Sequence, residues 1–268
     1  MCVFFVRPAC AIAAGGVSHG TYFATYTGDD YTALAIESRR TFDAPTGKRS
    51  VFDDACKVVA LSARAVFIAD GIISNSDPRA PRFDVFVDAV DAYRRATPAG
   101  SLGNAAELWA ADLKRSITGL YPFYRDLMDH RADDEIVGGY FLGIDDDDKL
   151  TGFQVKITHA KATARFDAVV MPIQKGNYTL PGPGPARLVK EFVAGQSARA
   201  MAAQSQIRKE ALGKSAAEAR VVEMKYLVKT IPAWANDPGS GGDIAQIVID
   251  AAEKRWRWIH RPDFCPEN

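Results

Sequence analysis

Hydrophobic residues in this chain follow the two-residue period of strands in some segments and the period of helices in others. In chain order the segments read as four strands, two helices, two or more strands, two helices and two strands. Their approximate ranges are 21–27, 31–38, 57–61, 65–69, 83–96, 104–121, 136–144, 152–158, 186–214, 216–231, 244–249 and 255–260. Strands in blocks that alternate with pairs of helices indicate two antiparallel sheets with helix layers outside them. We therefore predict an α+β fold, a four-layer αββα sandwich of two antiparallel sheets.

Length and charge limit the number of domains and the partners. With 268 residues, of which 47% are hydrophobic, the chain can bury one sizeable core, and we expect residues 21–268 to form a single domain. Lys and Arg total 33, as do Asp and Glu, so the net charge of zero gives no support for nucleic acid or an anionic membrane as a partner.

No apolar run approaches the roughly 18 residues of a membrane-spanning helix. The 4 cysteines and 4 histidines lack ligand spacing, so we expect no metal and no cofactor.

Residues 1–20 have the features of a signal-like segment or a pro-segment. A short apolar stretch at 9–16 is followed by small residues at Ser18 and Gly20, three and one positions before a possible signal-peptidase cut after Gly20. Such a cut would make Thr21 the N-terminus and would place the protein in the periplasm or outside the cell. Without export, residues 1–20 are an N-terminal tail and the protein is cytoplasmic.

The cysteines leave one pairing open. Removal of residues 1–20 would take away Cys2 and Cys10 and leave Cys56 and Cys265. These two could form a disulfide in an oxidising compartment, but their distance in the sequence does not determine whether they meet in the fold.

Five short motifs occur in order along the chain. They are HGT at 19–21, IESR at 36–39, DACKVV at 54–59, ADG at 69–71 and DPGSGG at 237–242. In this order and spacing they resemble the motifs of a proteasome β-type subunit, one of the N-terminal nucleophile (Ntn) hydrolases. An HGT junction after a signal-like segment is also similar to the secreted proteasome-like proteins of bacteria. The resemblance covers 20–71 and 236–260, and between these ranges it rests on the order of strands and helices.

The resemblance implies that Thr21 is a nucleophile. A threonine hydroxyl is weak at its ordinary pKa and needs a base, which in this family is the α-amine of the same threonine. Because the pKa of an α-amine lies near 8, a useful fraction is neutral at physiological pH. The mechanism therefore requires a cut after Gly20, by export or by self-cleavage.

Five further residues receive roles from the resemblance. Lys57 would lie near the hydroxyl and disfavour protonation of the amine, and Glu37 would pair with Lys57 and hold it charged. Gly71 would bring its backbone N–H close to the oxyanion of the tetrahedral intermediate. Asp237 and Ser240 would form hydrogen bonds around the α-amine and orient it.

Two positions depart from the family pattern. Glu37 stands where the family has Asp, and its extra methylene must fold back or shift the strand. Where the family has Gly-Ser-Gly before the third helix, this chain has Gly182-Pro183-Gly184. Proline offers neither a hydroxyl nor an N–H, so the amine would have one partner fewer.

The sequence leaves three functions open. The first is hydrolysis of a peptide or other small amide with Thr21 as nucleophile. The second is a non-catalytic proteasome-fold scaffold or binding subunit that keeps its N-terminal segment. The third is an Ntn enzyme with Cys2 as nucleophile after loss of Met1, although no matching glycine motif follows Cys2. A homo-oligomer is expected only because the family assembles into rings.

Overall fold

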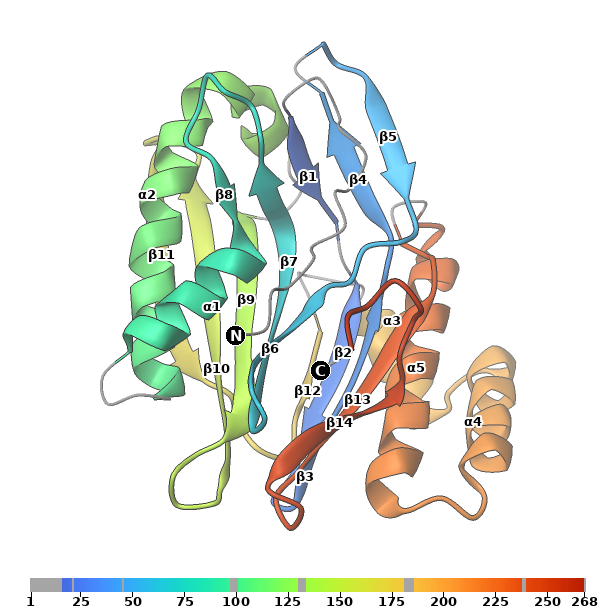
Figure 1. The fold of residues 1–268 in the computed structure, drawn as a ribbon. Helices are drawn as coiled ribbons and strands as arrows, with labels where there is room; N and C mark the ends of the chain where they lie inside the picture. The colour runs from blue at the N-terminus through green and yellow to red at the C-terminus, as the bar shows by residue number, and fades with distance from the viewer. Residues whose placement is uncertain are drawn as a thin grey trace.

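The computed structural model describes residues 16–20, 22–44, 46–96, 101–129, 134–180, 186–237 and 240–267. Over these ranges the chain forms two antiparallel sheets and five helices (Figure 1). The sheets lie face to face, with α1 (Val85–Arg95) and α2 (Leu102–Asp129) outside one, and α3 (Ala186–Ala194), α4 (Ala198–Ala211) and α5 (Ala216–Ala235) outside the other. The predicted α+β fold with two antiparallel sheets is confirmed, and the order of the layers is compatible with the predicted sandwich.

The larger sheet contains the segment that precedes position 21. Its strands are β1 (Val17–His19), β4 (Arg40–Asp43), β5 (Arg49–Phe52), β6 (Val58–Ser62), β7 (Ala65–Asn75), β8 (Phe83–Asp84), β9 (Glu135–Ile144), β10 (Leu150–Ala160) and β11 (Arg165–Pro172). The order across the sheet is β11-β10-β9-β7-β1-β4-β5, and β6 and β8 also pair with β7. Residues 17–19, which belong to the predicted signal-like segment, thus lie between β7 and β4 and run antiparallel to both.

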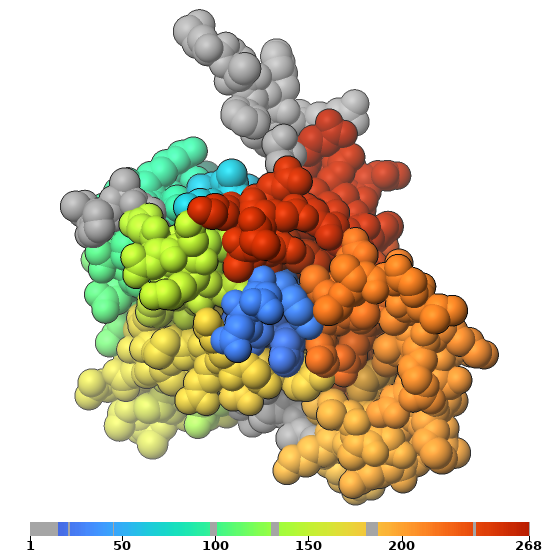
Figure 2. All heavy atoms as spheres, turned by 90° about the horizontal axis from the view of Figure 1, so that it is seen from below, coloured from blue at the N-terminus to red at the C-terminus, as the bar shows by residue number. Residues whose placement is uncertain are grey.

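The smaller sheet begins directly after position 21, with the predicted hairpin. Its strands in spatial order are β12 (Tyr178–Thr179), β2 (Phe23–Thr27), β3 (Tyr31–Glu37), β13 (Ile244–Asp250) and β14 (Arg255–His260). Gly28 N donates to Tyr31 O over 2.9 Å and closes the β2–β3 turn. Figure 2 shows the blue end of this hairpin at the surface, next to the red β13–β14 segment. Glu37 is at the opposite end of β3 and therefore lies away from this turn.

Local sequence explains where several helices begin and end. Ser215 and Glu218 form a capping box at the start of α5, in which each side chain accepts a hydrogen bond from the backbone N–H of the other residue. The predicted helical region 186–214 is divided into α3 and α4, because Gly195 takes a φ of +62° after α3 and Ser197 caps α4. None of the helices in the described ranges is long and apolar enough to cross a membrane.

Helix α2 continues beyond its predicted end at residue 121. Pro122 lies inside it, and Tyr124 has non-helical angles of φ −132° and ψ 32°, so the helix is kinked there. The residues after the kink face the β4–β5 hairpin across a cavity of about 740 Å³, which Asp43 and Arg49 also line.

Three clusters of buried apolar residues fill the spaces between the layers. One lies between the larger sheet and α1 and α2 and includes Val17 and Trp109. The second lies between the sheets and includes Phe23 and Tyr140, and the third lies between the smaller sheet and α3 to α5. Because Val17 and Phe23 belong to different clusters, the segments on the two sides of position 21 enter different parts of the core.

Candidate active site

Glu37 and Lys57 form a buried ion pair at the centre of the candidate site. Glu37 ends β3, and Lys57 stands directly before β6. Their side chains are 2% and 0% exposed, and Lys57 Nζ lies 3.8 Å from Glu37 Oε1. Lys57 Nζ also donates a hydrogen bond to the carbonyl oxygen of Arg39. The predicted pairing is therefore confirmed, while the catalytic role of the pair stays a prediction.

The Glu37 carboxylate also accepts hydrogen bonds from two backbone N–H groups. Tyr22 N donates to Oε1 over 2.8 Å, and Gly241 N donates to Oε2. The side chain of Glu37 thus bridges Lys57, the start of β2 and the loop after α5. Burial raises the pKa of Glu37, although the charge of Lys57 and the two N–H donors oppose the rise.

Lys57 shows the complementary effect of burial. Removal from water disfavours its charged form and lowers its pKa, and the Glu37 charge opposes this change. The pKa values of both members of the pair are therefore shifted toward neutral pH. Such shifts are typical of groups that transfer protons or tune a neighbouring nucleophile.

Gly71 occupies a position in β7 that only glycine can take. Its φ is +78°, and a Cβ atom built on it would lie 2.2 Å from the carbonyl oxygen of Ile136 in the neighbouring strand β9. Its own carbonyl oxygen accepts a hydrogen bond of 3.0 Å from Gly20 N. The predicted oxyanion donor thus lies in direct contact with the residue that precedes Thr21.

The loop after α5 brings Asp237 and Ser240 together. Ser240 Oγ donates to Asp237 Oδ2 over 2.9 Å, and the Ser240 carbonyl oxygen accepts from Arg39 Nη1 over 3.0 Å. Asp237 and Ser240 line a cavity of about 290 Å³ with Glu37, against α5. Residues 238–239 of the same motif lie outside the described residues.

Thr21 itself lies outside the described residues, but both of its neighbours in the chain make contacts with predicted site residues. Gly20 N donates to Gly71, and Tyr22 N donates to Glu37. Both donors are backbone groups, so the path of the chain determines these contacts. The described part of the site is therefore assembled around the chain segment that carries Thr21.

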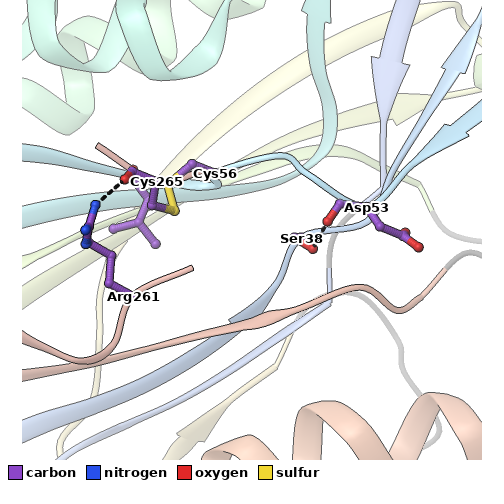
Figure 3. The surroundings of a disulfide bond; sticks show 6 residues. Ser38, Asp53, Cys56, Arg261 and Cys265 are labelled. Atoms are coloured by element: carbon purple, nitrogen blue, oxygen red, sulfur yellow. Dashed lines mark hydrogen bonds between the residues drawn. A yellow bond between two sulfur atoms is a disulfide. The ribbon is translucent and has the colours of Figure 1, made fainter. Parts of the chain in front are cut away.

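A hydrogen-bond network beside Glu37 was not predicted from the sequence. Ser38 Oγ donates to the carbonyl oxygen of Asp53 over 2.5 Å (Figure 3). Arg39 donates through Nε and Nη2 to the two carboxylate oxygens of Asp53, over 2.7 and 2.9 Å. The network joins the end of β3 to the segment that leads to Lys57. The sequence offers only opposite charges as a cue, without a spacing that would pair them.

A disulfide joins the segment before Lys57 to the C-terminal part of the chain. Cys56 and Cys265 are bonded although 209 positions separate them, and Figure 3 shows the bond on the same segment as Asp53. Arg261 Nη1 donates to the carbonyl oxygen of Cys265 over 2.7 Å. The pairing that the sequence left open is therefore present, directly next to the buried lysine.

Two further predictions fall on residues outside the described ranges, the Gly182-Pro183-Gly184 turn and the alternative nucleophile Cys2. Across the described part of the chain, no group of three or more His, Cys, Asp or Glu side chains is arranged to hold a metal ion. Comparison of the sequence with models of known protein families gives no match. Comparison with curated proteins gives none either.

Proposed function

We propose that the protein is an N-terminal nucleophile hydrolase with the Ntn fold, which cleaves a peptide or other amide bond after a cut between Gly20 and Thr21. The observation that carries this proposal is the surroundings of the residues next to Thr21. Gly20 contacts Gly71, the predicted oxyanion donor, and Tyr22 contacts Glu37, the partner of the buried lysine. Four separate segments of the chain thus converge where the new N-terminus would form.

In the proposed mechanism the cut creates the amine that serves as base. The amine takes the proton of the Thr21 hydroxyl, directly or through one water, and the oxygen attacks the amide carbonyl carbon. The backbone N–H of Gly71 donates to the oxyanion, and Lys57 disfavours protonation of the amine. Collapse of the intermediate expels the leaving amine, which takes up the proton, and water then hydrolyses the ester on Thr21.

Strand β1 supports a peptide as substrate, because it is an extended chain bound between two strands. Residues 17–19 pair with 72–75 of β7 and with 41–43 of β4. Backbone hydrogen bonds on both edges hold an extended segment whatever its side chains. Departure of β1 would leave two strand edges to which another extended chain could bind.

A non-catalytic role has one specific observation in its favour. Val17 of β1 is fully buried, and β1 connects β7 to β4 in the strand order of the larger sheet. A protein that kept residues 1–20 attached would retain this arrangement and would have no free amine at Thr21. The fold would then serve as a scaffold or a binding subunit.

The disulfide favours a periplasmic or secreted location for this hydrolase. Disulfides form and persist in oxidising compartments and are rare in the cytosol. The Cys56–Cys265 bond uses the two cysteines that would remain after removal of residues 1–20. We extend the proposal to export, and a homo-oligomer remains part of it through the family resemblance alone.

The test compares the wild-type protein with Thr21→Ala and Thr21→Ser on fluorogenic peptide amides. We expect Thr21→Ala to abolish release of the fluorophore, and Thr21→Ser to retain part of it because hydroxyl and amine are both kept. Full activity in Thr21→Ala would contradict the proposal. Cys2→Ser, measured in parallel, should be as active as the wild type, whereas its inactivity would identify Cys2 as the nucleophile.

A further inference from the structure

His19 of β1 makes a side-chain contact that backbone pairing does not require. Its Nε2 lies 2.7 Å from Oδ2 of Asp43, and the two side chains are only 18% and 16% exposed. His19 stands opposite Thr41 in the β1–β4 ladder, so Asp43 is its diagonal neighbour on the same face of the sheet. Because an ionised carboxylate only accepts, the imidazole donates the proton in this bond.

Asp43 is held in place and charged by the neighbouring strand. Arg49 of β5 stands opposite it and donates through Nε to Oδ1 over 2.8 Å, with a longer contact of 3.3 Å from Nη2 to Oδ2. Burial alone would raise the pKa of Asp43, but the hydrogen bonds from Arg49 and His19 outweigh it and lower the pKa. The carboxylate is therefore ionised at neutral pH, and Oδ2 is directed to the strand that lies between β7 and β4.

We propose that Asp43 forms the subsite for the second residue before the scissile bond and that it selects histidine there. This inference rests on the proposed function, in which the cut follows Gly20 and His19 is the second residue before it. A substrate strand that replaces β1 would present its corresponding side chain to Asp43 Oδ2. The N-terminal segment thus carries, at this position, the side chain that the subsite accepts.

The chemistry around Asp43 separates histidine from other side chains. Leucine would shield Oδ2 from water and leave it only the longer contact from Arg49 Nη2, so the loss of the short hydrogen bond would not be made up by solvent. Glutamate would bring a second negative charge against the carboxylate. Lysine would add a cation next to Arg49, which already contacts Asp43 and lines the cavity of about 740 Å³ together with Arg79 and Arg125.

The experiment measures kcat/KM on four peptide amides of sequence Val-Ser-X-Gly, each with a fluorogenic leaving group and with His, Leu, Glu or Lys at X. For the wild-type protein we expect His to exceed Leu about tenfold, the size of a hydrogen bond to a charged acceptor in a partly shielded site. Leu should in turn exceed Glu. The quantity compared between variants is the His-to-Leu ratio, which cancels changes in the amount of active protein.

Two variants of the same ion pair should move this ratio in opposite directions. Asp43→Asn keeps the shape and removes the charge, so the ratio should fall toward one. Arg49→Gln keeps an amide donor that can still hold Asp43 and removes the positive charge that competes with the imidazole for the carboxylate, so the ratio should rise. Asp147→Asn, which alters a side chain 78% exposed on the β9–β10 turn, is the control and should leave the ratio as it is.

The outcomes distinguish this inference from the proposed function. Equal cleavage of the His and Leu peptides, or an unchanged ratio in Asp43→Asn, would overturn the subsite and leave the hydrolase standing. Failure of the wild-type protein to cleave any of the four peptides would overturn both. Circular dichroism shows whether Asp43→Asn folds. If it does not, the order of the wild-type kcat/KM values and the direction in which Arg49→Gln moves the His-to-Leu ratio still test the subsite.

Discussion

The two segments that flank position 21 are held in the fold by different means. After it, β2 is joined to β3 by a tight turn. Phe23 packs between the two sheets, and its ring centroid lies 4.6 Å from that of Tyr140. Before it, the three-residue strand β1 is held by its pairing with β7 and β4 and by burial of Val17. A cut between the two would leave β2 attached through its hairpin and β1 bound only by non-covalent contacts.

The comparison also explains where the site lies. β1 belongs to the larger sheet and β2 to the smaller one, so the chain passes from sheet to sheet at position 21. The ion pair repeats this division, since Glu37 ends a strand of the smaller sheet and Lys57 leads into a strand of the larger one. A nucleophile formed at position 21 would therefore arise at the junction of the two sheets.

The largest effect is expected from Lys57→Met, which removes the positive member of the ion pair that links the two sheets. Activity on peptide amides should fall about 1,000-fold, in the range found for loss of a group that assists proton transfer. The free energy of unfolding should also fall, by about 3 kcal/mol, because Glu37 stays buried without its counter-ion and the Arg39 carbonyl oxygen loses its donor. Kinetics and urea unfolding measure the two effects.

Lys149→Met serves as the matched control for this variant. Lys149 is 70% exposed on the β9–β10 turn, so its loss should affect neither quantity. Activity of Lys57→Met equal to that of Lys149→Met would remove Lys57 from the mechanism.

Phe23→Ala and Val17→Ala compare the two flanking segments directly. In the uncut chain, identified by its intact mass, we expect losses of about 4 and about 2 kcal/mol in the free energy of unfolding. In the cut protein the Phe23 effect should persist, while the Val17 residue would be absent with the departed segment. Urea unfolding of both forms checks this, and a Val17 effect that persists after the cut would show that β1 stays bound.

Gly71→Ala should destabilise the protein by about 3 kcal/mol, since the new methyl group would meet the Ile136 carbonyl oxygen and the positive φ would be strained. Gly176→Ala is the control, because Gly176 has a φ of +79° with no atom within 4 Å of the added Cβ. It should cost only about 1 kcal/mol from backbone strain. Equal losses in thermal or urea unfolding would show that the close approach of β9 to Gly71 is not tight.

A pH dependence of the free energy of unfolding should arise from Glu37. Burial raises its pKa from 4.5 to about 7, so the folded state binds the proton more tightly than the unfolded state does. The resulting stability is fully present below pH 4.5 and is lost as the pH rises through about 7. Relative to Glu37→Gln, the free energy of unfolding should thus fall by about 3 kcal/mol across this window. If the free energy of unfolding of the wild type, relative to Glu37→Gln, rises with pH instead, the pKa of Glu37 is lowered and not raised by the fold.

Elements with strong local signals were predictable, and those held by distant partners were not. The aromatic and β-branched residues on both sides of the Gly28 turn mark the β2–β3 hairpin, and a capping box marks the start of α5. By contrast, β1 and β5 have three and four residues, too few to show a period, and exist because neighbouring strands pair with them. The break between α3 and α4 depends on Gly195, which a helical pattern tolerates in sequence.

The candidate site divides in the same way. Glu37 and Lys57 each lie within a short motif, and the family resemblance is enough to predict that they pair. The bond between Cys56 and Cys265 and the bidentate contact of Arg39 depend on segments brought together by the sheets, so no spacing indicated them. The resemblance predicts the contacts of those residues to which it assigns a role, whereas other contacts made by the tertiary structure have no signal in the chain.

The most direct measurement is the intact mass of the wild-type protein purified from its native host, in the compartment where it accumulates. The account predicts a mature chain that begins at Thr21, with the disulfide between Cys56 and Cys265 formed. A chain that still contains residues 1–20 would lack the amine that serves as base, and would contradict the hydrolase in favour of a non-catalytic protein in which β1 stays between β7 and β4.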